Sequence, residues 1–182
     1  MRKCLLLLGF VFLIVACGSP EAATPTVEQE VTMAFKLTSA VFTHGEAIPT
    51  LYTCDGEDLS PPLSWSGAPE ATQSYVLICD DPDAPVGVWD HLILFNIPAS
   101  TSELPEGITE RTDGSLYGKN SWRRLDYGGP CPPRGVHRYF FRLYALDAML
   151  TIKEGASKRE VERAMQGHIL SQTELMGTYT HR

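Results

Sequence analysis

The chain has 182 residues, of which 43% are hydrophobic and 20% are charged, and its formal net charge is −7 at pH 7. This length and hydrophobic content support one well-buried core without a second domain, and no internal repeat or low-complexity tract interrupts residues 33–182. The acidic balance argues against broad affinity for nucleic acid or anionic membranes, so any anion site must be local.

The N-terminal residues have the layout of a lipoprotein export signal. Two charged residues, Arg2 and Lys3, precede an apolar run over 5–15 that is too short to span a bilayer. The run ends in a small residue followed by Cys17, as at a cleavage site that leaves a lipid-modified cysteine. We expect residues 1–16 to be a signal peptide and Cys17 to be the lipidated first residue of the mature chain. An ordinary secretory signal that ends near a cysteine is the alternative.

Residues 17–32 read as a flexible tether between the lipidated cysteine and the domain. They are rich in Pro, Thr, Ala and Glu and have almost no large apolar side chain, so burial cannot offset the entropy of ordering them. Two or more fatty chains on one cysteine hold a protein stably at a membrane. We therefore expect a location in the cell envelope, on the extracytoplasmic face, with residues 33–182 as a single domain. Loss of Arg2 and Lys3 would take the formal charge from −7 to −9.

The cysteines predict one disulfide. Cys4 would be removed with the signal and Cys17 would carry lipid, which leaves Cys54, Cys79 and Cys131 in an oxidising compartment. Three cysteines allow at most one internal bridge. Cys79 ends the apolar run VLIC and is typical of a small buried thiol. Cys54 and Cys131 lie in loops rich in Gly and Pro, so we predict that they pair.

Four segments of the domain are predicted to be strands. Residues 33–37 alternate apolar with smaller or polar side chains, as a half-buried strand does. The runs 75–79 and 92–97 are short, apolar and bounded by turn-forming residues. Residues 137–146 carry aromatic side chains on both faces, which suits a strand near the centre of a sheet.

One helix is predicted, late in the chain. Ser157 and Glu160 form a capping-box pattern, and apolar residues then recur at helical spacing, so we expect a helix from this cap to about residue 175. His168 falls on the apolar stripe of that helix, which indicates a structural role. Residues 98–136 are rich in Gly and Pro and are predicted to be loop, and loops of that length are usually functional or define the fold. The pattern favours a mostly-β sandwich or sheet core with a peripheral helix.

The first candidate site segment is the loop DPDAP at 81–85, directly after the strand predicted over 75–79. Its prolines fix their own backbone angles and restrict the residues before them, so the carboxylates of Asp81 and Asp83 are held in place. The alternative is that both aspartates only cap a Pro-rich turn.

The other candidate segments supply imidazoles. His91 opens the strand predicted over 92–97, and the loop GGPCPPRG at 128–135 leads into a further histidine, His137. Alternation along that strand puts His137 and Tyr139 on one face and Arg138 on the other. A satisfied pair of core side chains is the alternative for His137 and Tyr139.

These segments resemble the two signatures of the phosphatidylethanolamine-binding protein family, in its bacterial Raf kinase inhibitor-like branch and in a lipoprotein form. The signatures are DPDAP followed by a histidine, and GGPCPPRG running into HRY. The flanking segments CDGEDLSPPLSW, FNIP, LYALD, AMQGHIL and GTY are also similar, so the resemblance covers essentially all of 33–182. Arg123 and Asp126 depart from the glycines expected there and change the charge of that loop.

The resemblance implies a β-sandwich of antiparallel sheets with a small pocket for phosphate-like head groups or other small anions. Imidazoles and a phenol would donate hydrogen bonds to anionic oxygens, and glycines would let main-chain amides approach. Asp81 would orient a histidine rather than touch the anion. The implied pocket residues are Asp81, Ala84, Pro85, His91, Gly129, Pro130, His137 and Tyr139.

The sequence therefore predicts a binding protein without catalysis, cofactor or metal. Its expected partners are a small anion or a phospholipid head group, the membrane through the lipid anchor, and no nucleic acid. One alternative is an inhibitor of a protease or kinase that acts through the pocket loops. The other is an enzyme that uses Asp81, His91 and His137 as a metal site or as an acid and base. Against the enzyme, the mature chain has no HExxH, GxSxG or CxxC motif.

Overall fold

The computed structural model describes residues 34–109 and 111–181, all within the unit Thr32–Arg182. The predicted signal peptide over 1–16, the lipidated Cys17 and the predicted tether to residue 32 lie outside the described residues, as does Met33. Among the described residues, no helix has both the length and the apolar character needed to cross a bilayer.

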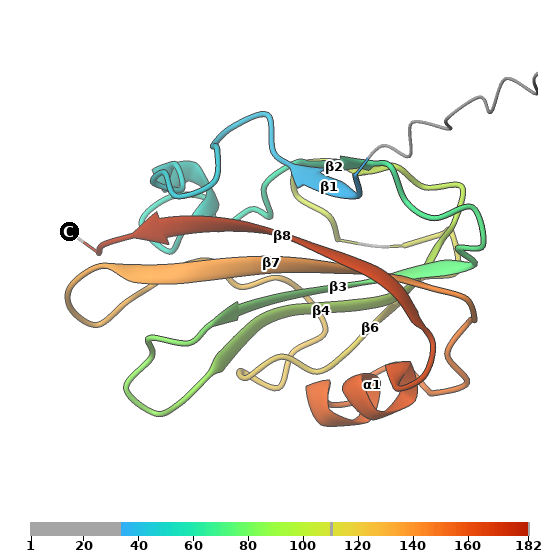
Figure 1. The fold of residues 1–182 in the computed structure, drawn as a ribbon. Helices are drawn as coiled ribbons and strands as arrows, with labels where there is room; N and C mark the ends of the chain where they lie inside the picture. Colours follow the sequence, from blue (N-terminus) through green and yellow to red (C-terminus); the bar gives the residue numbers. More distant parts are fainter. Residues whose placement is uncertain (1–33, 110, 182) are drawn as a thin grey trace, which may run out of the picture. The chain divides into compact units, whose positions relative to one another are not determined.

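The larger of two sheets has five antiparallel strands in the order β6-β4-β3-β7-β8 (Figure 1). These strands are β3 (Ser74–Asp81), β4 (Trp89–Pro98), β6 (Leu116–Tyr117), β7 (His137–Leu146) and β8 (Ile169–Tyr179). The strands predicted over 75–79, 92–97 and 137–146 fall in β3, β4 and β7. Every residue of β3 is buried because this strand is central and covered on both faces, which explains its continuous apolar run.

The smaller sheet has three antiparallel strands in the order β1-β2-β5. They are β1 (Lys36–Thr38), β2 (Leu63–Ser66) and β5 (Glu103–Leu104), and a short 3-10 helix, η1 (Thr50–Tyr52), lies between β1 and β2 in the chain. Strand β1 overlaps only the end of the segment predicted over 33–37, and β2 was not predicted. Strands β5 and β6 lie in the region predicted to be loop, but each has only two residues.

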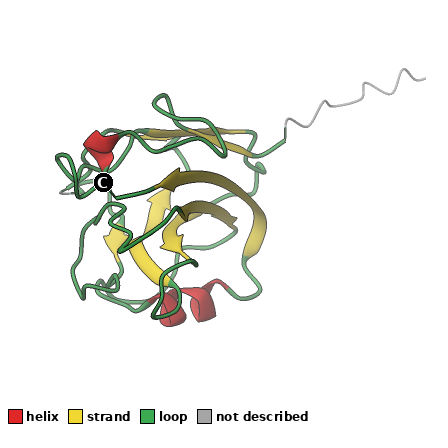
Figure 2. Ribbon diagram, turned by 90° about the vertical axis from the view of Figure 1, so that its left-hand side faces the viewer, coloured by secondary structure: helices red, strands yellow, loops and turns green. Residues whose placement is uncertain are grey.

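Alternation along the strands creates two cores, one on each face of the larger sheet. The first core lies between the sheets and the second lies under the helix α1 (Lys158–Met165). Figure 2 shows α1 and η1 on opposite sides of the strands of the larger sheet. From β3, the first core takes Tyr75, Leu77 and Cys79, and the second takes Val76 and Ile78. The predicted mostly-β sandwich with a peripheral helix is confirmed.

The predicted helix begins as expected but ends far too early, at Met165. The capping box is present, because the Ser157 side chain accepts from the Glu160 amide and the Glu160 carboxylate accepts from the Ser157 amide. Gly167, with φ of 82°, then turns the chain. The prediction of helix to about residue 175 is wrong because those residues form β8, which pairs with β7 along its length. Long-range pairing overrides a local helical pattern.

Strand β8 therefore replaces the helix as the last element. Because the helix ends early, His168 lies in the turn before β8 and not on the apolar stripe of a helix. The His168 imidazole is exposed and its Nδ1 lies 2.8 Å from a carboxylate oxygen of Asp147.

Candidate functional site

Two adjacent aspartates at the end of β3 point to opposite faces of the larger sheet. Asp80 lies on the helix side, where its carboxylate pairs with Arg142 and, at 2.7 Å, with Lys158. Asp81 lies on the other side, following Cys79 in the alternation. Only Asp81 is therefore available to the candidate site, because both oxygens of Asp80 already accept from cations.

Asp81 and His137 form a buried pair. The Nδ1 atom of His137 lies 2.7 Å from Oδ2 of Asp81, and the two side chains are 8% and 5% exposed. They meet because β3 and β7 are antiparallel neighbours whose register ends at Asp80 opposite Phe140. A carboxylate accepts, so His137 Nδ1 carries the proton and donates it. The second ring nitrogen, Nε2, makes no hydrogen bond to a described residue.

The loop after β3 is held by both of its carboxylates. Asp81 Oδ1 accepts from the Asp83 amide at 2.8 Å, so the capping role considered as an alternative coexists with the pairing to His137. Asp83 in turn accepts three hydrogen bonds from the main chain and guanidinium of Arg138. The side-chain bonds from Arg138 lower the pKa of Asp83 to about 2. The loop is thus fastened to the first two residues of β7.

His91 is the second imidazole of the site and is held from the opposite side. It lies at a register shift of β4 against β3, between the pairs Asp80↔Asp90 and Cys79↔Leu92. Its Nδ1–H donates to the carbonyl oxygen of Gly128 at 2.6 Å. Burial lowers the pKa of His91, so the neutral ring predominates at pH 7. With Nδ1 protonated, the neutral ring presents a lone pair at Nε2.

Two aromatic rings fix the plane of His91. The rings of Trp122 and Tyr139 both meet it edge to face, with centroids 5.1 Å away. Trp122 was not predicted as a site residue, because the sequence showed it only as part of a polar loop. Its position beside His91 depends on the folding of residues 118–128 back over β4, where the Ser121 amide donates to the Asp90 carbonyl.

Tyr139 does not play the predicted role of a donor at the pocket surface. Its side chain is fully buried, and its hydroxyl makes no hydrogen bond among the described residues. Burial raises the pKa of the phenol, and the nearby Cys131 amide only partly opposes this rise. Tyr139 therefore packs against the His91 ring and does not offer its hydroxyl at the surface.

Gly129 also differs from expectation, because its amide is already bonded. The amide donates to Oδ1 of Asp58 at 2.6 Å, so it is not offered to a ligand. A side chain at this position would lie only 2.5 Å from the same oxygen and 2.6 Å from the Tyr52 carbonyl. Glycine is needed here for close approach of two loops. Asp58, which was not predicted, has no signal in the sequence beyond its place in the segment CDGEDLSPP.

Asp81, His91, Trp122, His137 and Tyr139 form one cluster, and the remaining predicted residues lie around it. Pro130 is buried and its carbonyl accepts from the Cys54 amide at 3.1 Å. Ala84 and Pro85 lie in the loop between β3 and β4, with Pro85 exposed, and no hydrogen bond links them to either histidine. A disulfide joins Cys54 to Cys131, and Cys79 is a buried free thiol whose pKa is raised by burial.

The arrangement does not favour the alternative of a metal site at Asp81, His91 and His137. Within the described residues, the one set of three or more ligand atoms lying within 4.8 Å of one another consists of Cys54, Cys131 and His181. The two site histidines each use Nδ1 for a protein acceptor and leave only Nε2.

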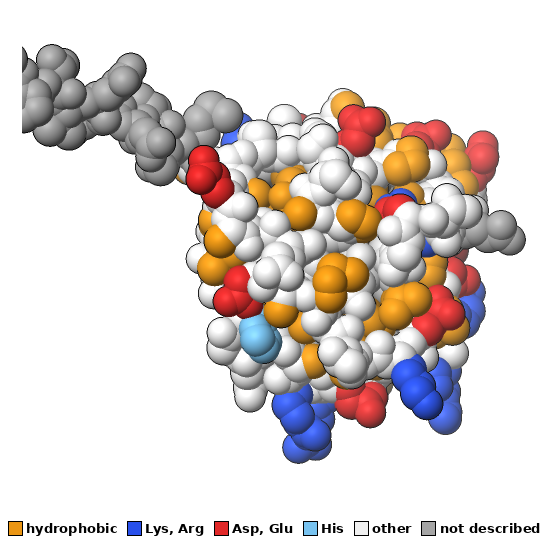
Figure 3. All heavy atoms as spheres, turned by 90° about the vertical axis from the view of Figure 1, so that its right-hand side faces the viewer, with side chains coloured by type: hydrophobic (Ala, Val, Ile, Leu, Met, Phe, Trp, Pro, Cys, Tyr) orange, Lys and Arg blue, Asp and Glu red, His pale blue; other side chains and the backbone are white. Residues whose placement is uncertain are grey.

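Other surface features are weaker candidates for a functional site than this cluster. A hollow of about 470 Å³ beside α1 is lined by residues including Lys153, Glu160 and Arg163, but it holds no buried polar group. His44 accepts from the Met176 amide, and the turn at Arg123 and Arg124 is exposed. Figure 3 shows one end of the sheets, where basic side chains are few and separated, so no broad cationic surface covers that face.

Residues 38–180 match the phosphatidylethanolamine-binding protein family. This match covers most of the chain, including every strand that carries the cluster. The chain belongs to the phosphatidylethanolamine-binding protein family.

Relatives occur in archaea and bacteria. A UPF0098 protein of Methanothermobacter thermautotrophicus is 55% identical over 135 residues, which cover 72% of this chain and 89% of that protein. A UPF0098 protein of Chlamydia trachomatis is 43% identical over 149 residues, covering 79% and 97%.

Solved structures agree with this membership of the phosphatidylethanolamine-binding protein family. A homolog of the family from Chlamydia trachomatis, CT736, superposes with a TM-score of 0.78 at 42% identity and covers 82% of this chain and 99% of its own. YbcL of Escherichia coli, described as a new member of the mammalian family, gives a TM-score of 0.75 at 31% identity, covering 81% and 99%. The resemblance to bacterial members of the family that the sequence indicated is confirmed.

Proposed function

We propose that this chain is a lipid-anchored extracytoplasmic binding protein that holds a small phosphate-type anion between His91 and His137 and performs no catalysis. The observation that carries the proposal is the state of the four ring nitrogens. Both Nδ1 atoms are fixed on protein acceptors, and both Nε2 atoms are without a partner among the described residues. Solvent reaches both Nε2 atoms. Among the described residues, the side-chain atoms that are buried without a hydrogen-bond partner are Trp65 Nε1 and the hydroxyl oxygens of Tyr117 and Tyr139, and neither Nε2 is one of them.

The two histidines differ in what they offer to a ligand. His91 is neutral and presents an acceptor at Nε2. His137 donates from Nδ1 to the carboxylate of Asp81 at 2.7 Å, and in the ring form with both nitrogens protonated its Nε2 presents a charged donor. A matching ligand therefore combines an anionic oxygen, for His137, with a hydrogen-bond donor, for His91.

Two phosphate sources meet this requirement. A phosphate monoester with one proton has both an anionic oxygen and a hydroxyl, and a phosphoethanolamine head group has an anionic oxygen and an ammonium group. Sulfate has no hydroxyl near neutral pH, and a phosphocholine head group has no N–H. The site chemistry thus separates phosphate from sulfate and ethanolamine from choline.

The same contacts support binding over catalysis. The cluster and the adjacent core residue Cys79 supply no activated nucleophile. The Cys79 thiol and the Tyr139 phenol are buried, and burial raises the pKa of both. Each imidazole is fixed by a short hydrogen bond and by packing, which suits a preformed binding site.

The location of the protein is part of the proposal and is supported by the sequence. The charged pair, the short apolar run and Cys17 form the pattern of a lipoprotein signal. A lipid anchor would keep the site near phospholipid head groups and near soluble phosphate esters of the envelope.

A second candidate function is the modulation of a protein partner through the loops around the cluster. Val86, in the loop between β3 and β4, is 76% exposed, and Val136, just before β7, is 65% exposed. These two exposed apolar side chains are the ones that a protein partner at these loops would contact. A stable envelope partner that is retained by a His137→Ala chain and lost by a Val86→Asp chain would favour this second function.

Calorimetric titration of the full chain tests the leading proposal. Phosphoethanolamine and glycerophosphoethanolamine should bind, and sulfate and glycerophosphocholine should bind at least tenfold more weakly. Affinity for a phosphate monoester should fall as pH rises from 5.5 to 8, because the monoester loses the hydroxyl that would donate to His91. Sedimentation with vesicles containing phosphatidylethanolamine then separates a membrane source from a free phosphate ester.

The matched variants are His137→Ala and His168→Ala, since both rings pair with an aspartate but only the first belongs to the cluster. Loss of a hydrogen bond to a charged oxygen should weaken binding by about 1.5–3 kcal/mol in His137→Ala and leave His168→Ala unchanged. Equal affinity for phosphate and sulfate, or affinity that is flat across this pH range, would contradict the proposal.

A further inference from the structure

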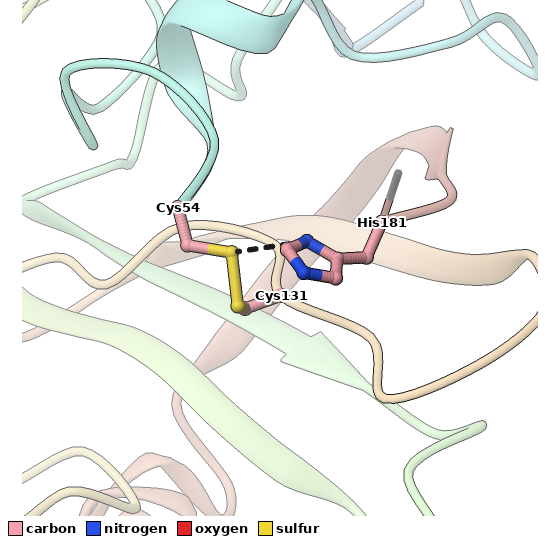
Figure 4. A group of neighbouring side chains, drawn as sticks. All are labelled: Cys54, Cys131 and His181. Carbon is pink, nitrogen blue, oxygen red and sulfur yellow. Dashed lines mark hydrogen bonds between the residues drawn. A yellow bond between two sulfur atoms is a disulfide. The ribbon is translucent and has the colours of Figure 1, made fainter.

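We propose that Cys54, Cys131 and His181 form a zinc site when the disulfide between the two cysteines is reduced. Figure 4 shows the His181 imidazole beside the bridge, with the three residues coming from separate segments of the chain. Their ligand atoms, two Sγ and one ring nitrogen, all lie within 4.8 Å of one another, and all three residues are exposed. This site is separate from the cluster at His91 and His137.

The chemistry of the donors fits zinc. Thiolate sulfur and imidazole nitrogen are the usual protein ligands of Zn²⁺, at roughly 2.3 Å and 2.0–2.1 Å in tetrahedral geometry. These lengths put a sulfur and a nitrogen ligand about 3.5 Å apart and two sulfurs about 3.8 Å apart. Cys54 Sγ and His181 Nδ1 already lie 3.8 Å apart. The Cα atoms of the cysteines are 5.4 Å apart, so side-chain rotation alone can separate the sulfurs once their bond is broken.

The two cysteine loops are also joined by contacts that do not involve the disulfide. The Cys54 amide donates to the Pro130 carbonyl at 3.1 Å, and the Gly129 amide donates to Asp58 at 2.6 Å. A buried tyrosine hydroxyl, that of Tyr127, donates to the Tyr52 carbonyl at 3.1 Å. Reduction therefore leaves the two thiols facing each other, and a metal ion meets a largely preformed pair.

A carboxylate stands beside the third ligand. Asp55 lies 3.0 Å from His181 Nδ1 and accepts from the Tyr179 hydroxyl at 2.6 Å. Two thiolates and this carboxylate would place three negative charges around a divalent cation. The Asp55 carboxylate or solvent can fill a fourth ligand position, because the site is exposed.

The reaction that creates the site balances with a dithiol reductant, such as a thioredoxin-type protein. The dithiol breaks the bond between the cysteine sulfurs, is oxidised to its own disulfide, and passes two electrons and two hydrogens to Cys54 and Cys131. Zn²⁺ then binds both sulfurs and His181, and the two thiol protons are released. Bound metal protects the thiols, and a disulfide oxidant that re-forms the Cys54–Cys131 bond, and is itself reduced to two thiols, expels the metal, so metal content would report the redox state.

The experiment compares the oxidised full chain with the same chain reduced by a water-soluble trialkylphosphine. The phosphine takes up the oxygen of one water molecule as phosphine oxide and leaves two protein thiols, without chelating metal strongly. Each form is then titrated with Co²⁺, whose tetrahedral thiolate complexes absorb in the visible and near-ultraviolet. We expect one Co²⁺ per reduced chain, displaced by Zn²⁺, and no such absorption from the oxidised chain.

Matched variants test the ligand set in the reduced state. Cys54→Ser should abolish the thiolate-to-cobalt absorption, and His181→Ala should weaken binding by at least tenfold, whereas His168→Ala should bind as the parent does. Circular dichroism of each chain shows whether it is folded. Equal binding by oxidised and reduced parent chains, or no binding by the reduced parent, would overturn the proposal without any variant. Unchanged cobalt affinity in a folded His181→Ala chain would remove His181 from the site.

Discussion

Replacing Asp81 with asparagine should weaken anion binding while leaving the fold in place. The carboxylate accepts from His137 at 2.7 Å and from the Asp83 amide at 2.8 Å. The single oxygen of asparagine can still accept from the Asp83 amide, which keeps the loop in place, while its NH2 group faces His137 and favours the ring tautomer with the proton on Nε2. The negative charge beside the His137 ring is lost, so a hydrogen bond from Nε2 to an anion is no longer supported by a charged partner at Nδ1.

The size of the effect follows from the change in hydrogen-bond class. A hydrogen bond with a charged partner contributes about 1.5–3 kcal/mol, and a neutral one contributes about 1 kcal/mol. Asp81→Asn should therefore lose about 1–2 kcal/mol of binding free energy, which is a loss of about 5- to 30-fold in affinity for phosphoethanolamine. Calorimetric titration at pH 6 measures this change directly.

Asp80→Asn is the matched control, because Asp80 is the neighbouring residue on the opposite face and pairs with Arg142 and Lys158. This variant should lower the thermal stability, since it leaves two cations without full compensation, but should bind phosphoethanolamine like the parent. If the two variants weakened binding equally, or if folded Asp81→Asn bound like the parent, the pairing of Asp81 with His137 would have no part in recognition.

Three further predictions concern stability. Replacing both Cys54 and Cys131 with serine should lower the free energy of unfolding by about 2–4 kcal/mol in a denaturant titration, because the bridge joins residues 77 positions apart. A loss below about 0.5 kcal/mol would mean that the other loop contacts suffice. Ser157→Ala should lower it by about 1 kcal/mol through loss of the helix cap, and an unchanged melting temperature would argue against the capping box. Because the pKa of His91 is lowered in the folded protein, the unfolded chain binds this proton first, so stability should be full above about pH 6.5 and fall below it. His91→Gln should flatten that fall, and an equally steep fall in the variant would assign it to other groups.

The candidate site was predictable where strand alternation and proline geometry decide it. The pattern over 137–146 placed His137 and Tyr139 on one face, and the structure does so, with both residues buried and Arg138 between them exposed. The resemblance to the family implied that Asp81, the last residue of β3, orients a histidine, and its Oδ2 lies 2.7 Å from Nδ1 of His137. These features depend on contacts of adjacent strands and turns, which the period-two pattern encodes.

Other features depend on partners that are distant in the sequence. The apolar residues at helical spacing from Val161 to Ile169 predicted a helix to about residue 175, yet residues 169–179 pair with β7 as β8, and that pairing buries Leu175 and Tyr179 against the first core. The Gly129 amide looked free, but Asp58 reaches it from another loop. Tyr139 was expected to reach a ligand, and only the packing of His91 and Trp122 over the site shows that its hydroxyl is enclosed.

The selectivity expected of the site follows from a difference between two similar residues. His91 and His137 are both nearly buried and both donate through Nδ1. The acceptor is a carbonyl in one case, that of Gly128, and a carboxylate in the other, that of Asp81. At His91 the effect of burial outweighs the hydrogen bond to the Gly128 carbonyl and lowers the pKa, so the ring is neutral, whereas His137 has a negatively charged acceptor. The pair can therefore offer one acceptor and one donor at the same pH, and only a ligand with the opposite pair of groups satisfies both nitrogens.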